Sequence, residues 1–198
     1  PMYYYAQKYL KIDPGVMITA SHNPKEYNGF KVAFDDFGNA CGQMIQDFRV
    51  YTEEGNFKTG KGNVSTYDIK EAYLKAIKES IKMGDKKIKV VLDTANGTAS
   101  IIAKEVYSMF DNIELVPLNI ESDPAFPNHH PDPSVEANNK MLKDEVLKTH
   151  ADVGIGIDGD GDRVGIIDEK GTMIFIDFFA IIIWRDIMDK VENKNALF

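Results

Sequence analysis

The chain has 198 residues, of which 43% are hydrophobic and 27% are charged, and its formal net charge at pH 7 is −8. This composition is ordinary for a globular protein, and the length allows one large domain or two small ones. The negative charge argues against non-specific nucleic-acid binding, which requires a basic face. A single cysteine, Cys41, excludes an internal disulfide framework and fits a reducing cytoplasm. The most apolar run, residues 175–184, is much shorter than the ~20 residues of a membrane span and predicts a core helix.

The first part of the chain carries short elements. We expect a helix over residues 3–10, strands over 16–18 and 30–34, and a helix over 43–52. Residues 55–66 are rich in glycine and poor in large apolar side chains, which is typical of a linker. We therefore place a domain boundary near residue 66.

After residue 66 the hydrophobic pattern becomes stronger. It predicts helices over residues 68–81, 99–110, 136–148 and 177–191. It also predicts strands over 88–92, 113–118 and 153–157, and a hairpin that pairs 164–168 with 173–176. Because strands that alternate with helices are joined by crossovers, the fold class is α/β, with two domains of mixed, mainly parallel sheets flanked by helices.

The run Asp158-Gly-Asp160-Gly-Asp162-Arg163 follows an apolar stretch and carries three carboxylates at alternate positions. Hard oxygen ligands aimed at one point are what Mg²⁺ or Ca²⁺ requires. The simplest alternative is a solvated acidic turn. Three like charges on a loop held by a strand repel one another, however, and this costs stability unless a cation compensates.

Two other kinds of site use the same residues. The carboxylates of Asp158, Asp160, Asp162 and Glu169 fall at the first, third, fifth and twelfth places of an EF-hand calcium loop. Arg163 stands where that loop needs glycine, and the flanking runs are β-branched. In a haloacid-dehalogenase-like phosphatase, Asp158 would be the nucleophile and Asp160 the acid. A non-catalytic calcium-binding module and a phosphatase therefore remain open as interpretations of this run.

Far upstream, Ser21 also follows an apolar run, and by itself it is ordinary turn chemistry. The wider string Gly15-Val-Met-Ile-Thr-Ala-Ser21-His22-Asn23-Pro24-Lys-Glu-Tyr27-Asn28-Gly29-Phe30-Lys31 resembles the phosphoserine loop of the α-D-phosphohexomutases. The acidic run resembles the second characteristic string of that family. Two further strings also resemble it and occur in its order: Asp93-Thr-Ala-Asn96-Gly97 and Phe126-Pro-Asn-His129-His130-Pro131-Asp132-Pro133.

The resemblance implies a four-domain α/β enzyme that moves phosphate between the 1 and 6 positions of a hexose. Ser21 would carry the phosphate, and Mg²⁺ would be held by a phosphate oxygen on Ser21 together with Asp158, Asp160 and Asp162. Lys31 is the candidate general acid or base and anion partner. His22 is a candidate proton carrier, and Arg163 suits a fixed contact to the phosphoryl group. The neighbouring histidines His129 and His130 are expected to be structural rather than metal ligands.

The glycines Gly159 and Gly161, together with residues 27–31, resemble the phosphomannomutase/phosphoglucomutase branch. By this resemblance the chain comprises most of domain 1 (residues 1–66), domain 2 (67–176) and the start of domain 3 (177–198), where Ala196-Leu197-Phe198 would begin a strand. The expected partners are a mannose or glucose phosphate and the missing C-terminal domains of the same protein, without nucleic acid or membrane. Because those domains orient the sugar, we expect negligible mutase turnover from the isolated chain.

Overall fold

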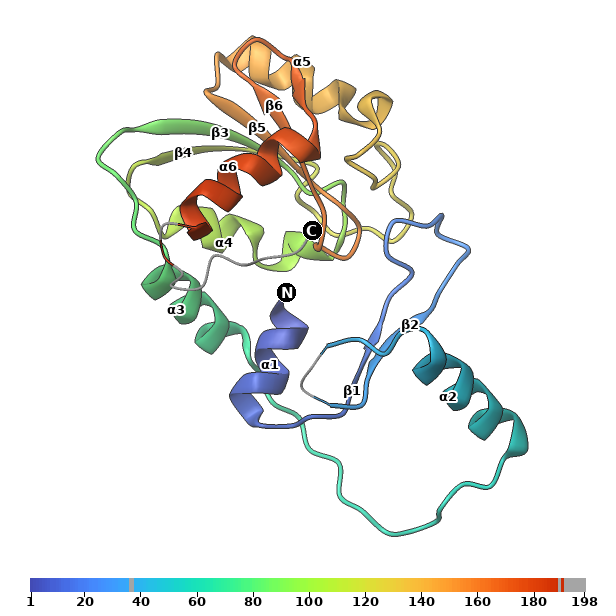
Figure 1. The fold of residues 1–198 in the computed structure, drawn as a ribbon. Helices are drawn as coiled ribbons and strands as arrows, with labels where there is room; N and C mark the ends of the chain where they lie inside the picture. Colours follow the sequence, from blue (N-terminus) through green and yellow to red (C-terminus); the bar gives the residue numbers. More distant parts are fainter. Residues whose placement is uncertain (36–37, 189, 191–198) are drawn as a thin grey trace. The chain divides into compact units, whose positions relative to one another are not determined.

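The computed structural model describes residues 1–35, 38–188 and 190 (Figure 1). Contacts within the chain define two compact units. Unit 1 comprises Pro1–Ala20 and Tyr27–Ile81, and unit 2 comprises Ser21–Glu26 and the chain from Lys82 onward. The short segment around Ser21 therefore belongs to the same unit as the acidic loop. The division near residue 66 stays a prediction.

Unit 1 consists of short elements in the order α1 (Met2–Leu10), β1 (Gly15–Ile18), β2 (Phe30–Ala33), α2 (Gln43–Glu54) and α3 (Lys70–Ser80). They confirm the predicted helices and strands of this part, with ends that differ by two residues at most. The strands β1 and β2 are antiparallel. The Tyr5 hydroxyl joins α1 to α3 by donating to the Ala72 carbonyl oxygen at 3.1 Å, and the Tyr5 and Tyr73 ring centroids are 5.3 Å apart.

Unit 2 is built on a mixed sheet of five strands in the order β4-β3-β5-β6-β7. Its strands are β3 (Ile88–Asp93), β4 (Ile113–Leu118), β5 (Val153–Ile157), β6 (Val164–Asp168) and β7 (Met173–Ile174). Strand β3 is parallel to β4 and to β5, whereas β5 with β6 and β6 with β7 are antiparallel. The α/β fold class and the hairpin are confirmed, although parallel pairings make up half of this sheet rather than most of it.

The core of unit 2 lies between the sheet and α5 (Lys140–Thr149), which covers one side while α4 (Ala103–Ser108) covers the other (Figure 1). Two side chains of α5, Leu142 and Val146, are fully buried. Gly154 on β5 allows this close packing, because a Cβ there would be 2.7 Å from Val146 Cγ2. The buried apolar cluster consists of Val91, Leu142, Val146, Ala151 and Ile167.

The two helices predicted over 99–110 and 136–148 are each interrupted near the start. A 3₁₀ turn, η1 (Thr98–Ile101), precedes α4, and a second, η2 (Glu136–Asn139), precedes α5. In η2 the buried Asn139 side chain donates to the Pro133 carbonyl oxygen at 2.8 Å, which ties the turn to the preceding loop. Sequence periodicity does not show this interruption, because the competing hydrogen bonds come from outside the helix.

Helix α6 (Ile176–Met188) confirms the predicted helix but not its predicted burial. None of its described residues is buried, and Phe178 and Ile182 are 63% and 62% exposed. Within the described residues, no helix combines the length and apolar character that crossing a bilayer requires. The strand expected at the end of the chain lies outside the described residues.

Candidate functional site

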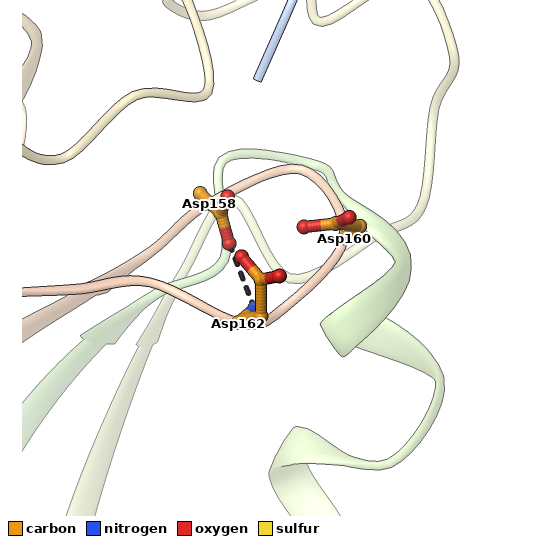
Figure 2. A group of neighbouring side chains, drawn as sticks. All are labelled: Asp158, Asp160 and Asp162. Carbon is orange, nitrogen blue, oxygen red and sulfur yellow. Dashed lines mark hydrogen bonds between the residues drawn. The ribbon is translucent and has the colours of Figure 1, made fainter. Parts of the chain in front are cut away.

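The acidic loop connects the antiparallel strands β5 and β6. The last residue of β5, Ile157, is paired with the first of β6, Val164. Within the loop, the Gly161 amide donates to the Asp158 carbonyl oxygen at 3.2 Å, and Gly161 has a φ of 78°, which favours glycine. The turn gathers one carboxylate oxygen from each of three side chains within 4.8 Å of one another, as Figure 2 shows for Asp158, Asp160 and Asp162.

Asp158 is the most buried member of this cluster, with 0% of its surface exposed. Its Oδ1 accepts hydrogen bonds from the Asp162 and Arg163 amides, both at 3.0 Å, whereas its buried Oδ2 has no hydrogen-bond partner. Burial, together with the charges of Asp160 and Asp162, raises the pKa of Asp158 to about 6. An unsatisfied buried oxygen beside two further carboxylates fits a hard cation such as Mg²⁺.

The Ser21 loop lies directly against the acidic loop. A Cβ built on Gly159 would be only 2.8 Å from the Ser21 carbonyl oxygen, so the two backbones approach as closely as a glycine permits. Ser21 has a φ of 56°, a left-handed conformation that costs a non-glycine residue about 1–2 kcal/mol. The predicted phosphate carrier and the predicted metal ligands are thus neighbours in unit 2.

His22 lies between Ser21 and Arg163. Its Nδ1 is 3.2 Å from Ser21 Oγ, and its Nε2 is 3.4 Å from Arg163 Nη1. Because a guanidinium can only donate, His22 Nε2 is the acceptor in that contact. The proton of a neutral His22 is then on Nδ1, which donates to Ser21 Oγ. This arrangement suits His22 to supply a proton to the serine oxygen rather than to remove one.

Asp132 was not among the predicted site residues, although it lies near His22 and Arg163. Burial acts to raise the pKa of Asp132, but hydrogen bonds from Ser134 and the charges of His22 and Arg163 outweigh it and hold the pKa below its usual value. Asp132 therefore supplies a fixed negative charge beside these two side chains. Its place in the string that ends Pro131-Asp132-Pro133 was the available sequence signal.

Comparison with known families decides what kind of protein carries this site. The family description "phosphoglucomutase/phosphomannomutase, alpha/beta/alpha domain II" matches residues 71–171, and that of "alpha/beta/alpha domain I" matches residues 1–56. The domain II match alone covers just over half of the 198 residues. The chain belongs to the phosphoglucomutase/phosphomannomutase family.

Relatives and solved structures from this family are similar to the whole chain. It is 39% identical over 200 residues to a phosphomannomutase/phosphoglucomutase of Pseudomonas aeruginosa, covering 100% of this chain and 42% of that protein. It is 33% identical over 200 residues to a phosphoglucomutase of Neisseria meningitidis serogroup A, covering 100% of this chain and 43% of that protein. A crystal structure of a phosphoglucomutase/phosphomannomutase family protein from Burkholderia thailandensis has a TM-score of 0.85 at 32% identity, covering 90% of this chain and 38% of that one. The chain thus spans less than half the length of these relatives.

Membership of the phosphoglucomutase/phosphomannomutase family weighs against both alternatives for the acidic loop. The loop is flanked by strands and not by the helices of an EF-hand, and Glu169 follows β6 at the end away from the loop. The five residues of β6 lie between Arg163 and Glu169, so six residue steps at ~3.3 Å each separate these two residues by about 20 Å.

The candidate lysine of this mutase family member lies in the other unit. Lys31 is on β2, where it pairs with Met17 on β1, and it is half-buried. Since β2 belongs to unit 1 and the acidic loop to unit 2, the role of Lys31 at the site stays a prediction.

His129 has the structural role that the sequence suggested. Its Nε2 is 3.0 Å from the buried Asp93 Oδ2, and its Nδ1 is 3.0 Å from the His130 carbonyl oxygen. Both ring nitrogens thus face acceptors, an arrangement that the doubly protonated imidazolium satisfies. The hydrogen bond to Asp93 raises the pKa of His129 above its usual value, against the opposing effect of burial. His129 therefore fastens the proline-rich loop to the end of β3.

This ion pair predicts a pH-dependent stability. Because the pKa of His129 is raised by folding, its stabilisation is complete below the unfolded pKa of about 6.5 and is lost as the pH rises through the higher folded pKa. We expect His129→Gln to abolish a fall of about 1 kcal/mol in the free energy of unfolding between pH 6 and pH 9, measured by urea denaturation. His150→Asn, which changes an exposed histidine at the left-handed end of α5, should keep the wild-type fall. Equal pH profiles for His129→Gln and wild type would contradict the prediction.

Proposed function

We propose that this chain carries the phosphoserine and the metal-binding loop of a phosphomannomutase/phosphoglucomutase, which interconverts hexose 1-phosphate and hexose 6-phosphate. The observation that supports this most is the approach of the Ser21 backbone to Gly159, because it brings the loop with the candidate serine against the loop that carries three convergent carboxylates. A phosphate on Ser21 would then share one ion with Asp158, Asp160 and Asp162. The phosphatase and the calcium module explain the carboxylates but not the adjoining serine.

In the proposed reaction, Ser21 gives its phosphate to the sugar and later receives the other one back. The bond between phosphorus and Ser21 Oγ breaks while a bond forms from phosphorus to a sugar hydroxyl oxygen, whose proton passes to a base, for which Lys31 is the candidate. Ser21 Oγ leaves as an oxyanion, and it can take the proton of His22 Nδ1, which lies 3.2 Å from Ser21 Oγ. The product of the first transfer is a hexose 1,6-bisphosphate, which turns around before the second transfer.

The electrostatics of unit 2 agree with this division of roles. Arg163 cannot lose its proton and supplies a permanent positive charge next to His22. Mg²⁺, held by the three aspartates, would neutralise charge that develops on the transferring phosphoryl group. Without the ion, the same three aspartates would repel a phosphate. Phosphate transfer at this site would therefore require both the aspartates and the bound ion.

We further propose the division of the chain into domain 1 (residues 1–66), domain 2 (67–176) and the start of domain 3. Helix α6 begins after the domain II match ends at residue 171, and its apolar side chains are exposed. This is expected of a helix whose partners belong to a further domain. The residues that select the sugar would belong to the further domains, and those domains would therefore decide between mannose and glucose phosphates.

The proposal is tested by locating phosphate on the full-length protein after exposure to hexose 1,6-bisphosphate with Mg²⁺. Peptide-resolved mass spectrometry should find phosphate on Ser21 and not on Asp158. Ser21→Ala should abolish it, and Ser65→Ala, which changes an exposed serine in the linker, should not alter it. Phosphate on Asp158 would favour the phosphatase, and a Ser21 that is never phosphorylated would rule out the phosphoserine mechanism.

A further inference from the structure

The residue between the first two aspartates of the acidic loop is held by a segment that carries no site residue. Gly159 is buried, and its carbonyl oxygen accepts two hydrogen bonds from Thr98, one from the amide at 2.9 Å and one from the hydroxyl at 3.0 Å. The amide of the same residue donates to the Pro131 carbonyl oxygen at 3.3 Å. Both backbone polar groups of Gly159 are therefore engaged by loops that follow other strands.

Gly97 makes the approach of Thr98 possible. A Cβ on Gly97 would be 2.8 Å from the Gly159 carbonyl oxygen and 2.9 Å from Gly159 Cα, distances that Cβ atoms do not tolerate. On another side of Gly159 lies the Ser21 carbonyl oxygen. Gly159 is thus packed between the Gly97-Thr98 segment and the Ser21 loop, with no room for a side chain at either glycine.

The Gly97-Thr98 segment is itself rigidly supported. The Gly97 amide donates to the Thr94 carbonyl oxygen at 2.7 Å. Thr94 is fully buried, and its hydroxyl lies 2.7 Å from Ser100 Oγ and 2.8 Å from the Asn119 carbonyl oxygen. A segment fixed in this way at the end of β3 can hold a neighbouring loop in one position.

We propose that Gly97 and Thr98 are positioning residues that set the acidic loop against the Ser21 loop. This inference rests on the proposed function of the acidic loop as a Mg²⁺ site. Gly97 and Thr98 act through the backbone of Gly159 and would contact neither the metal nor the phosphate. Fixing the two peptide groups that flank Gly159 Cα fixes the directions of the neighbouring carboxylates, those of Asp158 and Asp160. Groups that orient metal ligands in this manner commonly change metal affinity by about 10- to 100-fold when they are removed.

The test compares Mn²⁺ affinity, measured by electron paramagnetic resonance, among variants of the chain. Mn²⁺ prefers the same oxygen ligands as Mg²⁺ and reports its coordination in the spectrum. Thr98→Val removes the hydroxyl donor but keeps the amide donor, and we expect about tenfold weaker binding with a broadened spectrum. Thr98→Ser restores the hydroxyl and should bind within about twofold of wild type. Gly97→Ala should lose more than Thr98→Val because its Cβ would push against the Gly159 backbone.

The control is Thr149→Val, which makes the same exchange at a half-buried threonine of α5 whose hydroxyl donates to the Glu145 carbonyl oxygen at 2.6 Å. It should lower the melting temperature while leaving Mn²⁺ affinity and the spectrum unchanged. Equal affinities for Thr98→Val and wild type, or equal losses in Thr98→Val and Thr149→Val, would overturn the positioning role alone. A wild-type chain that binds no Mn²⁺ would overturn the proposed metal site and this inference with it.

Discussion

Replacing Asp158 by asparagine is expected to weaken Mg²⁺ binding by at least about 100-fold, because it removes a ligand charge and not merely a supporting bond. The amide oxygen of asparagine can still accept the hydrogen bonds that Asp162 and Arg163 now donate to Oδ1, so the turn should keep its shape. The same substitution should raise the metal-free stability at pH 8 by about 1 kcal/mol, since it removes one of three repelling charges. Binding and stability should therefore change in opposite directions.

Isothermal titration calorimetry with Mg²⁺ and urea denaturation in a chelator measure these two quantities for the Asp158→Asn variant. Asp111→Asn is the matched control, because it neutralises an exposed aspartate outside the cluster and should alter neither quantity appreciably. If Asp158→Asn bound Mg²⁺ as well as wild type, the acidic loop would not be the metal site. A loss of both binding and stability would instead mean that the carboxylate is needed for folding of the turn.

Gly159→Ala should slow phosphorylation of Ser21 by about 100-fold, the order of loss that a misplacement of ~1 Å causes. The new Cβ would meet the Ser21 carbonyl oxygen at 2.8 Å, and this contact is backbone, which cannot rotate away. Gly159 is enclosed by Gly97 and Pro131, so the half-buried Ser21 loop is the part that can yield. Because the three aspartates remain, we expect the Mg²⁺ affinity to fall by no more than about threefold. This loss is smaller than the losses of about 10- to 100-fold that follow removal of groups that orient metal ligands.

For Gly159→Ala, the rate of phosphate incorporation from hexose 1,6-bisphosphate into the full-length protein is the relevant measurement. Gly62→Ala, in the predicted linker and with open space around its Cβ position, controls for a general effect of exchanging glycine for alanine. A Gly159→Ala protein that is phosphorylated at the wild-type rate would show that the close backbone approach has no part in the transfer.

The local sequence pattern was sufficient to predict a feature wherever the residues that cause it all lie in one short segment. The acidic loop is such a case, because alternate carboxylates after an apolar strand converge once the chain turns at Gly161. The strands of unit 2 are another, since their apolar runs specify burial on both faces of a sheet. The wrong prediction for α6 has the opposite origin. Apolar character shows that burial of Phe178 and Ile182 would be favourable, but it does not show which surface would cover them.

By itself, then, the sequence determined the α/β class, the succession of most helices and strands, and the candidates Ser21, Asp158, Asp160 and Asp162. Only the tertiary structure showed that Oδ2 of Asp158 is buried without a partner, that His129 is engaged by Asp93, and that Thr98 holds the Gly159 peptide. The physical reason is that these features depend on contacts between loops that follow different strands. Spacing along the chain encodes the geometry of one loop, whereas the fold decides which loops meet and which atoms they desolvate.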